Sequence, residues 1–176
     1  MNEEDYSGIE RRNDKAASYD KPILDAIEFR RVWDNMKHKI HRVWEESEYN
    51  FDSEAFLDCI WEVSTEDLPG LEVSVVVDAN NKLFIGKGTG SFVDYKSENV
   101  TGMMIPLKCW IHTHPFGAAY FSGTDWFTIN TQRPILNSAI VLGNMERMKW
   151  YKNREGEEIL CRMESTTMKE LKGEEE

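Results

Sequence analysis

The chain has 176 residues, 40% of them hydrophobic and 11% aromatic, which suits one domain with a sizeable core. Its formal net charge is −11, from 32 acidic and 21 basic side chains, and this sign argues against a nucleic-acid partner. Three widely separated cysteines, an odd number without a C-x-x-C pair, argue against a disulfide framework and favour a reducing compartment.

The sequence gives no indication of a membrane segment or a leader. Residues 1–20 contain no apolar core of the kind that secretory signals have. No stretch approaches the ~18 apolar residues that are needed to cross a bilayer. We therefore expect a cytoplasmic protein without a membrane partner. We predict a flexible segment over residues 1–20, one domain over residues 21–165 and a charged tail over residues 166–176.

The first predicted element is a helix that extends from about residue 20 to residue 47. Asp20 can cap it, Pro22 is tolerated in its first turn, and apolar residues recur along it every three or four positions. Its two histidines, His38 and His41, have no acidic or thiol neighbour in that run. We interpret them as solvated residues and not as metal ligands.

Residues 51–64, FDSEAFLDCIWEVS, fit two structures. Glu54, Asp58 and Glu62 repeat every four residues, which suits a short helix with one acidic face. Read as a strand, alternate residues of the same segment form an equally apolar face. We favour the helix and keep the strand as the alternative.

The rest of the chain contains mainly strand patterns. Residues 71–88, LEVSVVVDANNKLFIGKG, predict a hairpin, and a further strand with irregular flanks is expected within residues 88–102. The segment LKCWIHTH predicts a strand that ends at Pro115. A helix is expected to follow from Ser122 to Pro134, and after it NSAIVLG predicts a buried strand. The final pattern is a hairpin that turns near Gly156.

Two of the four histidines lie two residues apart at the end of a predicted strand. Because side chains alternate along a strand, His112 and His114 project from the same face and can chelate one metal ion. Pro115 cannot donate to a ladder, so the chain leaves the sheet there and the next loop can present Asp125 as a third ligand. Two imidazoles and a carboxylate are ordinary Zn²⁺ ligands, and three protein ligands leave a fourth tetrahedral position open for water.

The spacing H-T-H-P, six residues, Ser, two residues, Asp is far more specific than an isolated H-x-H. It resembles the H-[ST]-H-P-x6-S-x2-D signature of JAMM metalloproteases, also called MPN-plus domains, and coarser similarity extends from Leu71 to Gly143. The resemblance implies an α/β fold similar to that of cytidine deaminases, with a mixed sheet flanked by helices. It also implies Zn²⁺ bound by His112, His114 and Asp125, and hydrolysis of isopeptide bonds to ubiquitin or ubiquitin-like proteins.

Such a hydrolysis needs two further groups. A hydroxyl can donate to the oxyanion, and Ser122 is placed for this role as well as for capping the helix. A carboxylate that is not a ligand must take the proton of the water and return it to the leaving amine. In JAMM proteins this glutamate opens an early strand, usually before small and glycine residues. We favour Glu72, although valines and a serine follow it; Glu54 is the alternative if residues 51–64 are extended.

Other residues near the motif are assigned no chemistry. Thr113 is expected to point to the face of the strand opposite the two ligands, and Cys109 to face away from both histidines. Aromatic residues in such density more often pack a core than line a groove, and this is how we interpret Phe116, Tyr120, Phe121, Trp126 and Phe127.

Three functions remain. The first is a zinc-dependent isopeptidase that acts on conjugates of ubiquitin-like modifiers. The second is a JAMM-type peptidase that acts on small peptides, on the C-termini of sulfur-carrier proteins or on cell-wall peptides. The third is a non-catalytic MPN-type scaffold, against which the intact ligand set argues. We favour the isopeptidase, and the sequence leaves the substrate and the oligomeric state open.

Overall fold

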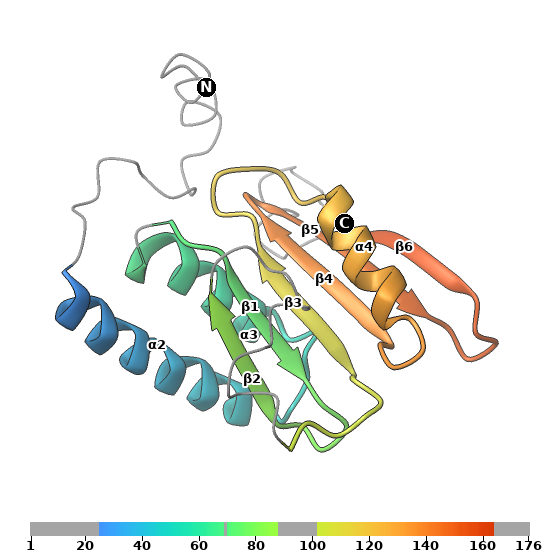
Figure 1. The fold of residues 1–176 in the computed structure, drawn as a ribbon, viewed down its shortest axis with the longest axis horizontal. Helices are drawn as coiled ribbons and strands as arrows, with labels where there is room; N and C mark the ends of the chain where they lie inside the picture. Colours follow the sequence, from blue (N-terminus) through green and yellow to red (C-terminus); the bar gives the residue numbers. More distant parts are fainter. Residues whose placement is uncertain (1–24, 69, 88–101, 164–176) are drawn as a thin grey trace, which may run out of the picture.

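The structure, a computed structural model, describes residues 25–68, 70–87 and 102–163 (Figure 1). The expected flexible segment, the strand expected after Lys87 and the charged tail lie outside these residues. Within them the strands are β1 (Val73–Val77), β2 (Leu83–Lys87), β3 (Cys109–Thr113), β4 (Ser138–Gly143), β5 (Glu146–Lys152) and β6 (Glu158–Met163).

The six strands form one mixed sheet in the order β2-β1-β3-β4-β5-β6. Only β3 and β4 pair in parallel, and all other neighbours are antiparallel. Both predicted hairpins are confirmed, because β1 pairs with β2 and β5 pairs with β6. The second turns through Gly156, whose φ of +80° suits a residue without a side chain.

Helices cover both faces of this sheet, which confirms the predicted α/β class. They are α2 (Ala26–Glu46), α3 (Glu54–Glu62) with a π-helical turn (Val63–Asp67), and α4 (Gly123–Gln132). Figure 1 shows α3 and α4 on opposite sides of the sheet. The core accordingly has two parts, one between the sheet and α2 with α3, and one beneath α4. No helix of these described ranges is long and apolar enough to span a bilayer.

The helix predicted from residue 20 begins later than expected. Asp25 has an extended backbone, with φ of −69° and ψ of 166°, and α2 begins at the next residue. The Asp25 carboxylate accepts hydrogen bonds from the N–H groups of Ile27 and Glu28, at 3.0 and 2.8 Å. Asp25 is therefore the N-cap of this helix, in place of the expected Asp20.

The segment with two possible structures forms a helix, so the strand alternative is wrong. Ser53 caps α3 by accepting from the N–H of Phe56. Phe56, Leu57 and Ile60 are buried against the sheet. Burial of this helical stripe, which the sequence could not show, decides between the two patterns.

Candidate metal centre

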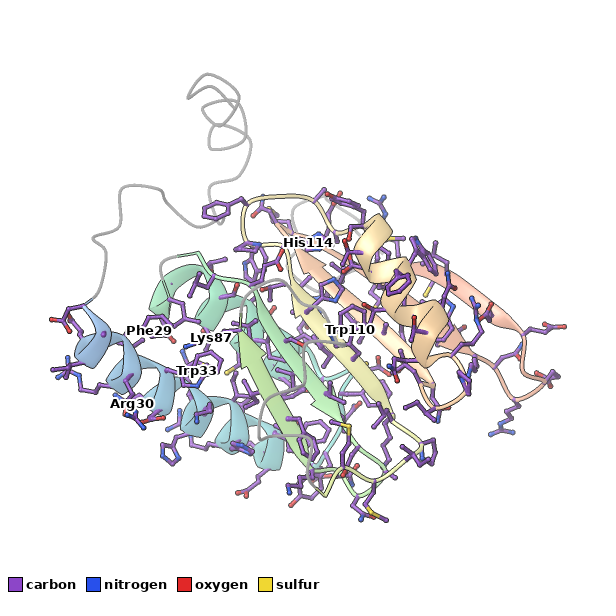
Figure 2. All side chains as sticks on the ribbon, in the orientation of Figure 1. Phe29, Arg30, Trp33, Lys87, Trp110 and His114 are labelled. Carbon is purple, nitrogen blue, oxygen red and sulfur yellow. The ribbon has the colours of Figure 1, made fainter. Side chains whose placement is uncertain are left out.

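The three predicted ligands meet where β3 ends and α4 begins. His112 is the fourth residue of β3, where it pairs with Ser74 of β1 and Val141 of β4. His114 follows the strand, and its N–H donates to the carbonyl of Leu142 at 2.7 Å, which keeps it alongside β4. Trp110 and His114 lie along β3 and its continuation (Figure 2). Asp125 lies in the first turn of α4.

The separations of the ligand atoms suit one metal ion. Oδ2 of Asp125 lies 3.2 Å from Nε2 of His112 and 3.4 Å from Nε2 of His114. One ligand atom from each of the three residues lies within 4.8 Å of the others. Metal–ligand bonds of about 2.0–2.1 Å in a tetrahedral site place neighbouring ligand atoms roughly 3.3 Å apart. The group could therefore bind a metal ion without a large movement of its side chains.

His112 is the most deeply buried of the three predicted ligands. Its side chain is 1% exposed and stacks on Trp110, with ring centroids 4.4 Å apart. Among the described residues neither ring nitrogen has a hydrogen-bond partner, so the close approach of Nε2 to Asp125 is not aligned as a hydrogen bond. An unsatisfied buried polar group costs about 1–3 kcal/mol, which a bound metal ion would offset. Burial also lowers the pKa of His112 and favours the neutral imidazole that metals bind.

The other two ligands support each other electrostatically. Burial opposes protonation of His114, but the Asp125 carboxylate outweighs this effect and raises the pKa of His114. Burial works to raise the pKa of Asp125, while contacts with His112 and His114 hold that pKa well below its usual range. Asp125 is therefore a carboxylate. The backbone of Ala118 also acts to raise the pKa of His114.

Ser122 caps α4 and orients the acidic ligand. Its Oγ accepts from the Asp125 N–H at 3.2 Å, and its own N–H donates to Asp125 Oδ2 at 2.8 Å. This reciprocal capping box fixes the carboxylate oxygen that faces both imidazoles. Because the Ser122 hydroxyl acts as an acceptor in the cap, its proton is not used there and can be donated to a substrate.

A cleft of about 540 Å³ opens beside the centre. It brings together three of the predicted site residues, Glu72, His114 and Ser122, while the other two ligands are buried. Apolar and glycine residues complete the lining: Gly70, Leu71, Pro115, Phe116, Gly117 and Tyr120. The predicted base, the predicted oxyanion donor and one ligand therefore face the same space.

Glu72 reaches this cleft because of the strand register. The last pair between β1 and β3 joins Ser74 to His112. Continuing the same register by two residues places Glu72 opposite His114, on the same face of the sheet. Its charge also acts to raise the pKa of both histidines. Glu72 as the catalytic base remains a prediction.

Glu54, the alternative base, has a different environment. It lies in the first turn of α3, and its carboxylate is 4.0 Å from Arg147, which also contacts Asp58. The extended segment on which its candidacy depended does not form. Helix α3 covers one face of the sheet, whereas α4 and the three ligands lie on the opposite face.

The two residues predicted to point away from the ligands do so. Cys109 packs in the core beneath α2 and α3. Burial raises the pKa of the Cys109 thiol to about 12, so it is unsuited to act as a ligand or nucleophile. Thr113 is also buried, and its hydroxyl contacts Ser64 of the π-helical turn.

The interpretation of the nearby aromatic residues as core is correct only in part. Phe121 is buried, but Tyr120 and Phe127 are 57% and 64% exposed. Phe116 and Tyr120 line the cleft, contrary to expectation. Composition alone could not separate these positions. Phe116, Tyr120 and Phe121 lie in a loop without a periodicity that fixes the direction of their side chains, whereas Phe127 lies on α4.

Gly143, a residue not predicted from the sequence to belong to the site, supports the loop between His114 and Ser122. A Cβ atom on Gly143 would lie 2.2 Å from the nitrogen of Ala119 and 2.5 Å from the carbonyl carbon of Ala118. A glycine within a strand is the available signal, because it often marks a close backbone approach.

Gly143→Ala is expected to displace this loop. The overpacking should lower the free energy of unfolding by about 1–3 kcal/mol and weaken metal binding. Thermal unfolding and metal titration measure the two effects. Gly123→Ala is the matched control, since a Cβ atom there meets nothing within 4 Å. Unchanged stability of Gly143→Ala would show that the loop does not depend on this contact.

Comparison with known protein families, characterised proteins and solved structures finds no match to the chain. Within the described ranges, His112, His114 and Asp125 form the one cluster of acidic, thiol or imidazole groups spaced for a metal ion. Function must therefore be inferred from this cluster, its cleft and the spacing of the motif.

Proposed function

We propose that the protein is a zinc-dependent isopeptidase of the JAMM type, acting on amide bonds to ubiquitin-like modifiers. One observation carries the proposal: two imidazoles and a carboxylate, with nitrogen-to-oxygen separations of 3.2 and 3.4 Å, lie beside a cleft that also contains Glu72 and Ser122. The motif spacing adds the JAMM resemblance.

Each side chain has one role in this reaction. His112, His114 and Asp125 hold the ion. When bound, zinc lowers the pKa of a coordinated water toward ~7 and polarises the scissile carbonyl. Glu72 accepts the proton of the attacking water and returns it to the leaving amine. Ser122 donates its hydroxyl proton to the carbonyl oxygen as negative charge develops there.

The cleft suits an extended peptide segment. Leu71, Phe116 and Tyr120 offer apolar contacts on its walls, and Tyr120 packs edge-on against His114 with ring centroids 5.0 Å apart. An apolar lining with a few polar groups is typical of sites that orient a substrate and exclude water.

The substrate class can be tested with zinc-loaded protein and a panel of isopeptide-linked modifier conjugates, linear fusions and short peptides, including cell-wall peptides. We expect cleavage of the isopeptide conjugates, lost on chelation and restored by zinc. Cleavage of short peptides alone would instead support the peptidase. A zinc-loaded protein that cleaves no member would contradict the proposal and favour the scaffold.

Ser122→Ala is expected to fold and to retain zinc but to turn over slowly. Loss of one oxyanion donor typically lowers kcat by about 10²–10³-fold. Loss of the cap should also cost about 1 kcal/mol of stability. Ser53→Ala, which removes the cap of α3 away from the cleft, is the control for the second effect. If the two variants turn over equally fast, Ser122 is a cap alone.

A further inference from the structure

A buried pair of hydroxyl groups lies behind the metal centre. Thr113, between the two histidine ligands, has its Oγ1 2.7 Å from Oγ of Ser64. Both residues are fully buried on the face of the sheet opposite the ligands. Ser64 comes from the π-helical turn that follows α3, so the contact joins two segments that are 49 residues apart.

The pair bonds to the backbone on both sides of Glu72. The Ser64 hydroxyl donates to the carbonyl of Leu71 at 2.5 Å. The N–H of Val73 donates to Thr113 Oγ1 at 2.9 Å. Because the Ser64 hydroxyl donates its one proton to the carbonyl of Leu71, it must accept the hydrogen bond from the Thr113 hydroxyl. The result is one directed chain from the Val73 N–H through both hydroxyls to the Leu71 carbonyl.

This chain of hydrogen bonds lies where β3 no longer supplies backbone partners to β1, although β2 still pairs with Val73. The ladder between β1 and β3 ends at the pair of Ser74 and His112, two residues after Glu72. Beyond that pair, Thr113 takes over as acceptor for β1 with its side chain. The N–H of Leu68 donates to the carbonyl of Val63, five residues earlier. Such π-helical turns are rare in proteins, and those that occur are frequently found at functional sites.

We propose that Ser64 and Thr113 are positioning residues that fix the backbone around Glu72 and so hold its carboxylate over the metal centre. This role depends on the function proposed above, in which Glu72 is the base. Thr113 is also flanked by His112 and His114. One residue therefore ties the position of the base to that of the ligands, which keeps the proton acceptor and the metal at a constant separation.

The test compares two substitutions of Thr113. Thr113→Val keeps the shape but removes both hydrogen bonds, whereas Thr113→Ser keeps the hydroxyl. We expect Thr113→Val to bind zinc and substrate normally, with KM unchanged, and to lose about 10–100-fold in kcat, because small misplacements of a reacting group are costly. Thr113→Ser should recover most of that loss. Thr65→Val is the matched control, because it removes a hydroxyl of the same π-helical turn that donates to the carbonyl of Trp61 in α3.

A second readout does not require activity. Amide hydrogen exchange measured by NMR should accelerate at Val73 in Thr113→Val, and should remain slow in Thr113→Ser. Ser64→Ala is the substitute if Thr113→Val does not fold. It leaves the acceptor of the Val73 N–H in place but removes the bond to the Leu71 carbonyl, so we expect a smaller acceleration at Val73 and a smaller loss of kcat. If the wild-type protein hydrolyses nothing, the proposed function fails. Faster exchange at Val73 in Thr113→Val would then still show that Thr113 holds the backbone beside Glu72. Wild-type kcat in Thr113→Val, or unchanged exchange at Val73, would overturn the positioning role.

Discussion

Glu72→Gln is expected to leave the fold and the zinc content unchanged and to abolish nearly all hydrolysis. Glutamine has almost the same shape as glutamate but cannot take a proton from water or return it to the leaving amine. General acid–base catalysis typically contributes about 10²–10⁴-fold to a rate, so kcat should fall by that factor. Elemental analysis and single-turnover assays of the same preparation separate loss of metal from loss of chemistry.

Glu54→Gln is the control for this result. Glu54 lies in α3, on the other face of the sheet and beside Arg147, so its loss should leave hydrolysis intact. The opposite pattern, an active Glu72→Gln and an inactive Glu54→Gln that retains zinc, would identify Glu54 as the base. It would also show that the cleft does not mark the reaction site.

Asp125→Asn is expected to weaken zinc binding severely. A neutral amide is a poorer ligand than a carboxylate, and the ionised Asp125 also balances the positive charge of the metal. Loss of an outer contact to a ligand costs about 10–100-fold in metal affinity, so loss of the ligand itself should cost at least about 100-fold. Competition with a chromophoric chelator measures the change.

The same substitution at another helix start provides the control. Asp25 caps α2 far from the centre along the chain, and asparagine is an equally good capping residue. Asp25→Asn should therefore keep the zinc affinity and the stability of the wild-type protein. Equal zinc affinity in Asp125→Asn and the wild type would remove Asp125 from the ligand set.

Local patterns predicted the part of the structure that carries the ligands. Alternation along β3 placed His112 and His114 on one face, and Pro115 marked the end of the strand. The capping signal at Ser122 gave the start of α4 and with it the place of Asp125. Each of these features depends on residues a few positions apart, which is why sequence alone could predict them.

Features that depend on distant packing could not be predicted. Residues 51–64 fit two periodicities until burial against the sheet decided for the helix. The sequence indicates no role for Thr113, because its partner Ser64 lies 49 residues away in the π-helical turn. The exposure of Tyr120 likewise depends on the path of a loop over the end of β4, which no local pattern fixes.

The most direct test of the metal centre is the zinc content of the protein purified without a histidine tag and equilibrated with one or more equivalents of zinc. After removal of unbound metal, elemental analysis should find one zinc per chain. His112→Ala should abolish this binding, because it removes the buried ligand whose ring nitrogens have no hydrogen-bond partner among the described residues. A wild-type protein that retains no zinc, or a His112→Ala variant that retains a full equivalent, would contradict the assignment of this site.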